Sequence, residues 1–117
     1  MSGDLVTLTI EEQGGVVVAR VAGELDLAAA PTMGDSIAAA TPTSARALIV
    51  DFTELEFIDS SGVSMLFSLA RRLGSRRQEL RVVAPPGRTV VRVLEIVQLD
   101  RAAPLHSDLE SALAEIG

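Results

Sequence analysis

The chain has 117 residues, of which 48% are hydrophobic and 3% aromatic, and its formal net charge is −6 at pH 7. This length and apolar content fit one globular domain over residues 1–117 and exclude a largely disordered chain. The chain contains no cysteine, which excludes disulfide bonds and cysteine-ligated metal sites.

The charge is concentrated in the first part of the chain. Residues 1–70 carry a net charge of −8, whereas residues 71–117 carry +2. An acidic surface repels nucleic acid and anionic membranes and suits a basic protein surface, so we expect no direct nucleic-acid or membrane partner. The short basic run RRLGSRR lacks interleaved aromatic residues and is more typical of a solvated helix end.

The N-terminal segment shows no basic residues before an apolar run, so a signal peptide is not expected. The apolar stretches are also shorter than the roughly 18 residues that cross a bilayer. The sequence therefore predicts a cytoplasmic protein.

Two strands are predicted first. Polar and apolar residues alternate over residues 5–10, which is typical of a half-buried strand, and residues 13–15 (QGG) favour a turn. The valine-rich run that begins at Val16 predicts a second strand. We expect the two strands to pair antiparallel as a hairpin.

A helix is predicted over residues 27–40, because Pro31 suits a first helical turn and alanines lie on both sides of it. Gly34 is expected to weaken this helix, and Thr41, which precedes a proline, to end it. Residues 47–52 form a continuous apolar run, which predicts a central strand buried on both faces.

A second helix is predicted from Val63 onward, because apolar residues recur at helical spacing as far as Leu73, and Gly74 can end it. Residues 80–86 then predict a strand that two prolines end. Residues 89–99 are rich in valine, yet the spacing of their apolar residues favours a helix.

The last segments predict a short edge strand over residues 102–105 and a final helix. Ser107 and Glu110 have the spacing of a capping box, and Leu109, Leu113 and Ile116 share one face. The predicted fold class is thus α/β, with a mixed sheet of four to five strands and about four helices. The crossovers between parallel strands should be right-handed.

The stretch DSSG, from Asp59 to Gly62, opens the second helix and allows two interpretations. Ser60 or Ser61 can cap the helix, which typically contributes about 1 kcal/mol. Alternatively, a hydroxyl at this position can accept a phosphate, which would add about −1.5 to −2 charge and could bind free N–H groups of the helix start. Composition alone favours the cap.

Three segments, residues 18–31, 48–66 and 90–116, resemble a STAS domain of the bacterial anti-sigma factor antagonist family. The first (VARVAGELDLAAAP) is similar to the family's strand ending in Gly-Glu-Leu-Asp. The second (LIVDFTELEFIDSSGVSML) is similar to its central strand, its Asp-Ser-Ser-Gly turn and its second helix. The third is similar to its last two helices and the strand between them. With the hairpin, the resemblance covers almost the whole chain in order.

The resemblance implies a regulatory function rather than an enzymatic one. In this family the unphosphorylated antagonist binds an anti-sigma factor that is also a serine kinase, which frees a sigma factor for transcription, as in stress responses. The kinase then phosphorylates the serine directly after the aspartate of the turn, and binding is lost. This implies that Ser60 is the acceptor, that Asp59 and Asp26 lie beside it, and that a phosphatase resets the switch.

The resemblance also implies a partner-binding surface around this turn, made of Asp26, Asp59, Ser61, Gly62, Ser64 and Met65. Ser64 and Met65 are expected on the outer side of the second helix. Ser64 stands where the family often has a second glycine, so its side chain is expected near the partner. Glu54 and Glu56 are expected on the same side, where they would repel a phosphate. Ser61 is expected to be mainly structural.

Other candidate sites have weaker support. His106 is the only histidine, and nothing in the sequence brings it near Ser60 as a catalytic pair, so we expect a surface residue. Residues 85–89 (PPGRT) lack the spacing and the lysine of a phosphate loop. We expect no cofactor, no metal and no catalytic residue. The alternatives to a phosphorylation switch are a nucleotide- or lipid-sensing STAS module and a signalling scaffold.

Overall fold

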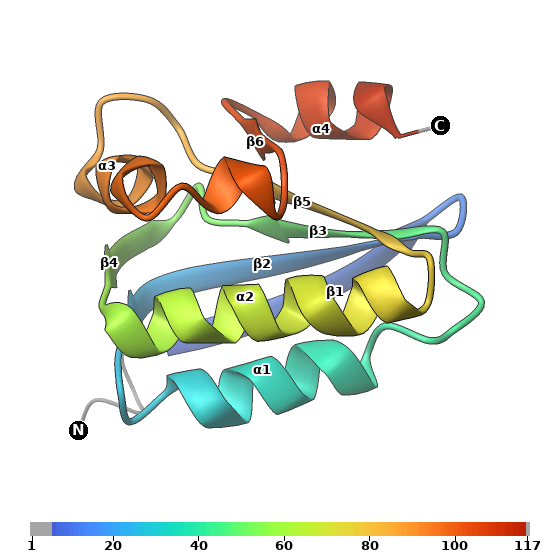
Figure 1. Ribbon diagram of the computed structural model, residues 1–117, viewed down its shortest axis with the longest axis horizontal. Coiled ribbons are helices and arrows are strands. Elements are labelled where there is room, and N and C mark those ends of the chain that lie inside the picture. Colours follow the sequence, from blue (N-terminus) through green and yellow to red (C-terminus); the bar gives the residue numbers. More distant parts are fainter. Residues whose placement is uncertain (1–5, 117) are drawn as a thin grey trace.

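A mixed sheet runs through the middle of the molecule, with helices on both sides of it (Figure 1). The computed structural model describes residues 6–116, and all structural statements below refer to these residues. The strands are β1 (Val6–Gln13), β2 (Val16–Leu25), β3 (Ala47–Asp51), β4 (Leu55–Ile58), β5 (Glu79–Val83) and β6 (Leu105–His106). The helices are α1 (Ala30–Ala39), α2 (Ser60–Ser75), α3 (Thr89–Ile96), the 3₁₀ turn η2 (Leu99–Arg101) and α4 (Leu109–Glu115).

The sheet is organised around the long strand β2. Its neighbours follow the order β1-β2-β3-β5-β6, and β4 pairs with β2 as well. The β1–β2 hairpin is antiparallel, as predicted, and turns over Gly14 and Gly15, whose φ angles of 57° and 83° suit a glycine pair. All other strand pairs are parallel.

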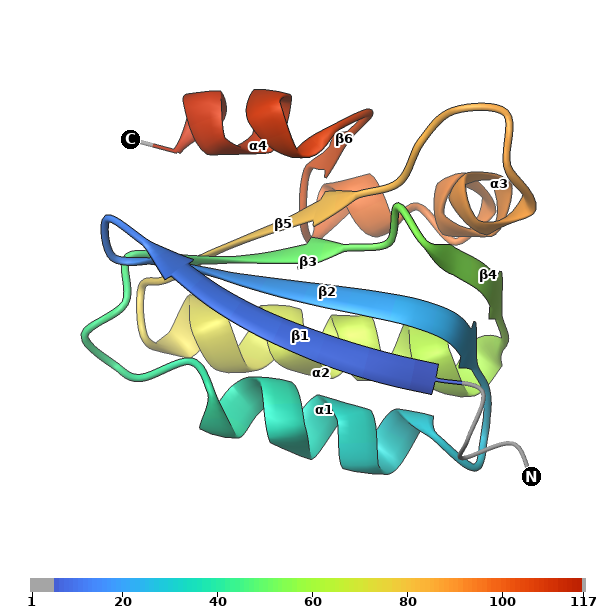
Figure 2. The same ribbon diagram turned by 180° about the vertical axis from the view of Figure 1, so that it is seen from behind.

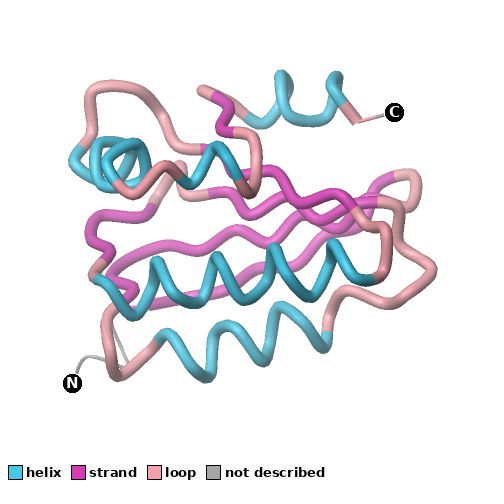
Figure 3. The backbone as a smooth tube through the Cα atoms, in the orientation of Figure 1, coloured by secondary structure: helices cyan, strands magenta, loops and turns pink. Residues whose placement is uncertain are grey.

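Two strands share one edge of β2. Residues 16–20 of β2 pair with β3, whereas residues 23–25 pair with β4 after a register shift between Gly23 and Glu24. The carboxyl ends of β2 and β4 therefore meet at one end of the sheet, and short connections lead from there into α1 and α2 (Figure 3). We call this end the helix-start pole (residues 24–30 and 54–62).

The helices form two unequal layers. Helices α1 and α2 cover one face of the sheet, and α4 lies on the opposite side, as the two views in Figures 1 and 2 show. The larger core lies between the sheet, α1, α2 and α3. A smaller core beneath α4 is formed by Val16, Val18, Ala47, Ile49, Val83 and Ala112.

The prediction of a central strand buried on both faces is confirmed. All five residues of β3 are buried, and Ile49 has no exposed surface. The strand ends with a buried acid, Asp51, which is 5% exposed. Its Oδ1 accepts hydrogen bonds from the backbone N–H and the hydroxyl of Thr53, and Arg20 lies 3.6 Å from Oδ2. Asp51 therefore meets the requirement that a buried charge be paired.

The number of strands differs from the prediction, because the sheet has six strands in the described residues rather than four or five. The strand that was not predicted is β4. Its buried residues, Leu55 and Ile58, lie at its ends with two exposed residues between them, so the alternation typical of strands is absent. The prediction of four α-helices in a mixed α/β fold is confirmed.

Several element boundaries also differ from the predicted ones. Helix α1 begins three residues later, at Ala30, with Pro31 in its first turn as expected. Helix α2 begins earlier, at Ser60, and continues through Gly74 to Ser75. The strand predicted over residues 102–105 lies at Leu105–His106. Apolar periodicity did not define these helix ends because the residues there are polar or small.

The capping box predicted for the last helix is wrong. Asp108 is the N-cap of α4, and its Oδ1 accepts the backbone N–H of Ser111 at 2.8 Å. This hydrogen bond, with one from the Ser111 side chain, holds the pKa of Asp108 below its ordinary value. Asp108 takes the N-cap position because its backbone is extended, with φ −151° and ψ 167°.

Candidate functional site

Asp59 connects the starts of two helices. It is the N-cap of α2, and its Oδ1 accepts the backbone N–H groups of Ser61 and Gly62 at 2.9 and 3.2 Å. Its Oδ2 accepts the backbone N–H of Leu27, before α1, at 3.1 Å. The cap of α2 is therefore Asp59, and the interpretation in which Ser60 or Ser61 caps the helix is wrong.

Asp26 has the corresponding position before α1. Its Oδ1 accepts the backbone N–H groups of Ala28 and Ala29, both at 3.1 Å, and its carbonyl oxygen accepts that of Ala30 at 2.8 Å. Asp26 follows β2 as Asp59 follows β4, and these two strands pair at Leu25 and Ile58. The structure thus brings both predicted acids to the helix-start pole, each bound to N–H groups at a positive helix end.

Ser60 is the first residue of α2 and is exposed to solvent. The sequence suggested that free N–H groups at the helix start could bind a phosphate on Ser60. Two of these groups, those of Ser61 and Gly62, are already bonded to Asp59, and that of Val63 is bonded to the Asp59 carbonyl oxygen at 3.0 Å. A phosphate on Ser60 would therefore have to compete with the Asp59 carboxylate or remain in solvent.

Gly62 is buried where α2 begins against the ends of β2 and β4. A Cβ atom at this position would lie 2.6 Å from Cγ1 of Ile58 and 3.0 Å from the carbonyl oxygen of Leu25. Both distances are shorter than a normal van der Waals contact. Gly62 therefore allows the close approach that places Ser60 at the edge of the pole.

Met65 does not lie on the outer side of α2, and that expectation is wrong. It is 7% exposed and packs toward α1, where a Cβ atom added to Gly34 would lie 2.9 Å from the Met65 Cγ. The resemblance implied that Met65 and Ser64 share the outer side, but only Ser64 is exposed. Gly34, which was expected only to weaken α1, leaves room for the Met65 side chain.

A groove of about 440 Å³ runs between α1 and α2. Met65 and Leu69 lie along it, the serines of α2 at positions 61, 64 and 68 line it, and Leu27 stands at the end near the pole. One acid and one base, Asp35 and Arg72, also line it. The groove therefore starts beside Ser60 and combines apolar and hydroxyl groups.

The loop between β3 and β4 is held from α3. Arg88, the N-cap of α3, donates from its guanidinium to the carbonyl oxygens of Thr53 and Leu55, the latter at 3.0 Å. This loop carries the exposed Glu54 and leads into Glu56. Arg88 therefore fixes the backbone at the edge of the helix-start pole.

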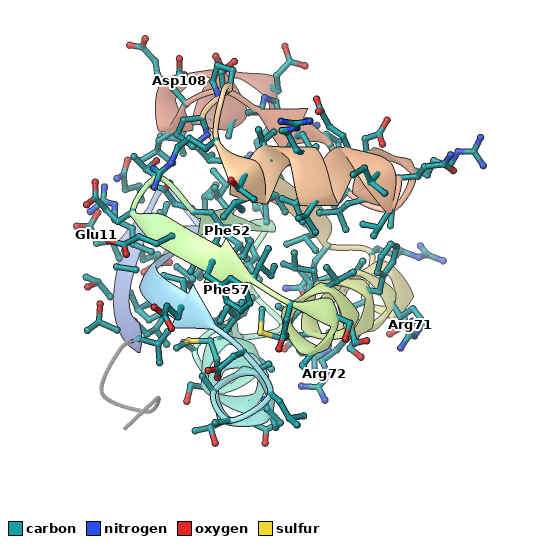
Figure 4. The ribbon with its side chains drawn as sticks, turned by 90° about the vertical axis from the view of Figure 1, so that its left-hand side faces the viewer. Glu11, Phe52, Phe57, Arg71, Arg72 and Asp108 are labelled. Atoms are coloured by element: carbon teal, nitrogen blue, oxygen red, sulfur yellow. The ribbon has the colours of Figure 1, made fainter. Side chains whose placement is uncertain are left out.

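Two exposed apolar residues at the pole were not identified from the sequence. Leu27 is 72% exposed and Phe57 is 47% exposed. Figure 4 faces this end of the molecule and labels Phe57 on β4. Nothing in the sequence distinguishes them from core residues, because leucine and phenylalanine side chains are most often buried.

His106 and the acids do not form a second site. His106, which was expected on the surface, is half-buried on β6, and its Nε2 lies 3.1 Å from Nη1 of Arg81. Within residues 6–116, no group of three or more metal-ligating side chains occurs. In the same range, no helix combines the length and the apolar character that a membrane span requires.

Comparisons with known proteins find similar chains that are named anti-sigma factor antagonists. An anti-sigma factor antagonist from Mycobacterium paratuberculosis has a crystal structure that is 33% identical, with a TM-score of 0.86 and coverage of 97% of this chain and 95% of its own. The anti-sigma-F factor antagonist RsfB of Mycobacterium tuberculosis is 29% identical over 113 residues, which cover 97% of this chain and 91% of RsfB.

A third relative was solved in a modified state. The structure of the Bacillus cell fate determinant SpoIIAA in its phosphorylated form is 26% identical, with a TM-score of 0.70 and coverage of 95% of this chain and 100% of its own. The STAS domain family as a whole matches residues 7–112. With the fold described above, this match shows that the chain belongs to the STAS domain family.

Proposed function

We propose that this protein is an anti-sigma factor antagonist that phosphorylation of Ser60 switches off. The observation that carries the proposal is the exposed hydroxyl of Ser60 at the first position of α2, directly after the capping Asp59. A relative named an anti-sigma-F factor antagonist and a relative solved in a phosphorylated form support it. Ser60 is accessible to a kinase without unfolding of the helix.

The unphosphorylated protein binds an anti-sigma factor with serine kinase activity, and this binding releases a sigma factor. The partner contacts Asp26, Asp59, Ser61, Gly62 and Ser64 around Ser60. Because Gly62 is buried and the two carboxylates are bound to backbone N–H groups, Asp26, Asp59 and Gly62 mainly fix the shape of the surface. Met65 contributes from within the groove.

Phosphorylation of Ser60 adds about −1.5 to −2 charge to a pole that is already acidic. The Asp59 carboxylate occupies the nearest N–H groups, so the phosphate remains in solvent and keeps its hydration shell. A hydrated phosphate prevents close contact with a partner at this position. The switch therefore needs no large conformational change, and a phosphatase restores binding.

The test starts from the Ser60→Ala variant, which cannot be modified at this position. Immobilised Ser60→Ala protein should capture an anti-sigma factor, which is then identified and purified. With that factor and ATP, wild type should be phosphorylated at Ser60, as localised by fragmentation mass spectrometry. Ser64→Ala, a matched control that removes another exposed hydroxyl of α2, should still be phosphorylated at Ser60.

Two results would contradict the proposal. One is phosphate on Ser61 or Ser64 with Ser60 unmodified. The other is unchanged binding of the anti-sigma factor after stoichiometric phosphorylation of Ser60. The Ser60→Asp variant should bind more weakly than wild type, although one carboxylate carries less charge than a phosphate.

The groove between α1 and α2 favours a second candidate function, the sensing of a nucleotide or lipid. Its volume of about 440 Å³ lies within the range of small-molecule sites, and its lining is partly apolar. Nucleotides and fatty acids should then raise the melting temperature of wild type. Ser68→Leu, which would fill the groove, should remove that effect.

A further inference from the structure

Phe57 is an unusual residue for the surface that it occupies. It lies on β4 between the buried Leu55 and Ile58, so the strand fixes its backbone while its side chain remains 47% exposed. The chain has only two other aromatic residues, and Phe52 is 1% exposed while Phe67 is half-buried. Phe57 is therefore the one exposed aromatic residue of the described chain.

A second exposed apolar side chain is fixed at the same pole. Leu27 is 72% exposed. Its backbone N–H donates to Oδ2 of Asp59, and Asp59 lies two residues after Phe57 in the chain. The two residues come from different strand ends that pair with each other, since β2 and β4 are in register at Leu25 and Ile58. The strand pairing and the hydrogen bond to Asp59 therefore fix the backbone that carries both apolar side chains.

The surroundings of these two residues are acidic. The helix-start pole contains five carboxylates and no lysine, arginine or histidine. Glu24 is the register partner of Phe57, and Glu54 and Glu56 are exposed beside it. The nearby cation, Arg88, donates to the carbonyl oxygens of Thr53 and Leu55. A partner that buries Phe57 must therefore provide positive charge around the contact.

We propose that Phe57, with Leu27 beside it, is the anchor by which the protein binds its anti-sigma factor, and that it enters an apolar pocket with a basic rim on that partner. This proposal rests on the proposed function. Aromatic side chains at the centre of an interface commonly carry most of the binding energy, whereas charges at the rim govern association rate and specificity.

The anchor also explains how a phosphate blocks a partner whose rim is basic. Attraction between the phosphate and the rim would favour binding, so charge alone does not account for release. A contact around Phe57 must exclude water, and Ser60 lies only three residues further along the chain. A phosphate on Ser60 must stay hydrated, so it is incompatible with a dry contact at this point.

The experiment measures binding of the purified anti-sigma factor to full-length variants by surface plasmon resonance. Phe57→Ser should weaken binding by at least about tenfold, mainly through faster dissociation, as expected for an anchor residue. Phe57→Leu, which stays apolar, should retain most of the affinity. Ile10→Ser is the matched control, because Ile10 is also a partly exposed apolar residue, at 38%, but lies on β1 outside the pole.

The salt dependence of association tests the proposed basic rim on the partner. Raising the salt concentration should slow association of wild type, and Glu56→Gln should reduce that dependence. Association that becomes faster with salt would overturn the basic rim. Circular dichroism of each variant verifies that it is folded. If Phe57→Ser unfolds, Leu27→Ser, which changes the other exposed apolar residue of the contact, should weaken binding, and unchanged binding would overturn the proposal.

The outcomes separate this inference from the proposed function. If wild type binds no anti-sigma factor, both proposals fail. If wild type binds and Ser60→Asp weakens binding while Phe57→Ser binds like wild type, only the anchor is overturned. If Phe57→Ser instead converts a dimer into a monomer and leaves partner binding unchanged, Phe57 serves contact between two copies, which also overturns the proposal.

Discussion

A single carboxylate fixes the geometry around Ser60. Asp59 accepts two N–H groups of α2 with one oxygen and the N–H of Leu27 with the other. The loop before α1 and the start of α2 are therefore held by the same side chain. Because Asp59 and Asp26 are bound to backbone N–H groups, they place the neighbouring residues as well as contributing negative charge to the pole.

Replacing Asp59 tests this role. Asp59→Ala removes the acceptor for three N–H groups and should lower the free energy of unfolding by about 1–2 kcal/mol, the upper part of the range of about 0.5–2 kcal/mol for helix caps. Asp59→Asn keeps one acceptor oxygen for α2 but loses the acceptor for Leu27, so its loss should be smaller. Urea denaturation of both variants provides the measurement. Equal stability of Asp59→Ala and wild type would show that the carboxylate does not hold the helix starts.

Among the elements, β3, the hairpin and the start of α3 could be predicted from the sequence, whereas β4 and the starts of α1 and α2 could not. A continuous apolar run such as that of β3 is compatible with few structures other than a strand buried on both faces. In β4, by contrast, Phe57 points outward because the edge of β2 and the start of α2 determine the register. Because this register is set by packing between elements, the four residues of β4 show no periodic pattern of apolar residues that the sequence could reveal.

The same limit applies to the candidate site. The motif and its resemblance correctly brought Asp26, Asp59 and Ser60 to one end of the sheet. The choice between Asp59 and the two serines as cap depended on which residue adopts an extended backbone, and at Asp59 φ is −111° and ψ is −170°. The burial of Met65 depended on the missing side chain at Gly34, which only the packing of two helices reveals.

The glycines of α1 and α2 give a prediction at the same scale. Gly74→Ala should stabilise the protein by about 0.5–1 kcal/mol, because a Cβ atom there meets no neighbour within 4 Å and helix propensity improves. Gly34→Ala should not give this stabilisation, because the Met65 side chain must move to make room for the new Cβ atom. Gly62→Ala should be the most destabilising, because the carbonyl oxygen of Leu25 belongs to the backbone of β2.

Thermal and urea denaturation of the three variants provide the measurement. The control is a second background, in which Met65→Ala removes the neighbour of Gly34. In that background Gly34→Ala should become stabilising. If Gly34→Ala has the same effect with and without Met65, the close approach of α1 and α2 is not what determines its cost.

At the scale of the whole molecule, the two cores depend on the same central strand. Ile49 has no exposed surface and belongs to the smaller core beneath α4, while its neighbours Leu48 and Val50 belong to the larger core. A change in β3 therefore affects both layers of helices. The stability of the domain is expected to depend on this strand more than on any surface charge.

Ile49→Asp should prevent cooperative folding, because it buries an unpaired carboxylate at a cost of several kcal/mol, comparable with the whole stability of a small domain. Ile96→Asp is the matched control, since Ile96 is 78% exposed and should tolerate the same substitution. Circular dichroism during heating distinguishes the two. A soluble Ile49→Asp protein with a sharp melting transition would contradict the central position of β3.

The margins of the sheet have a consequence for how the protein behaves at high concentration. An open strand edge is a template for pairing with other chains and hence for aggregation. Away from β1, the open edges are short, because β6 has two residues and β4, which in the described residues pairs only with β2, has four. The edge at β1 has eight residues but carries the adjacent, exposed glutamates Glu11 and Glu12, whose side chains project to opposite faces of the sheet. A second β1 laid alongside would bring like charges together, so the margins of the sheet resist fibril-like stacking of copies.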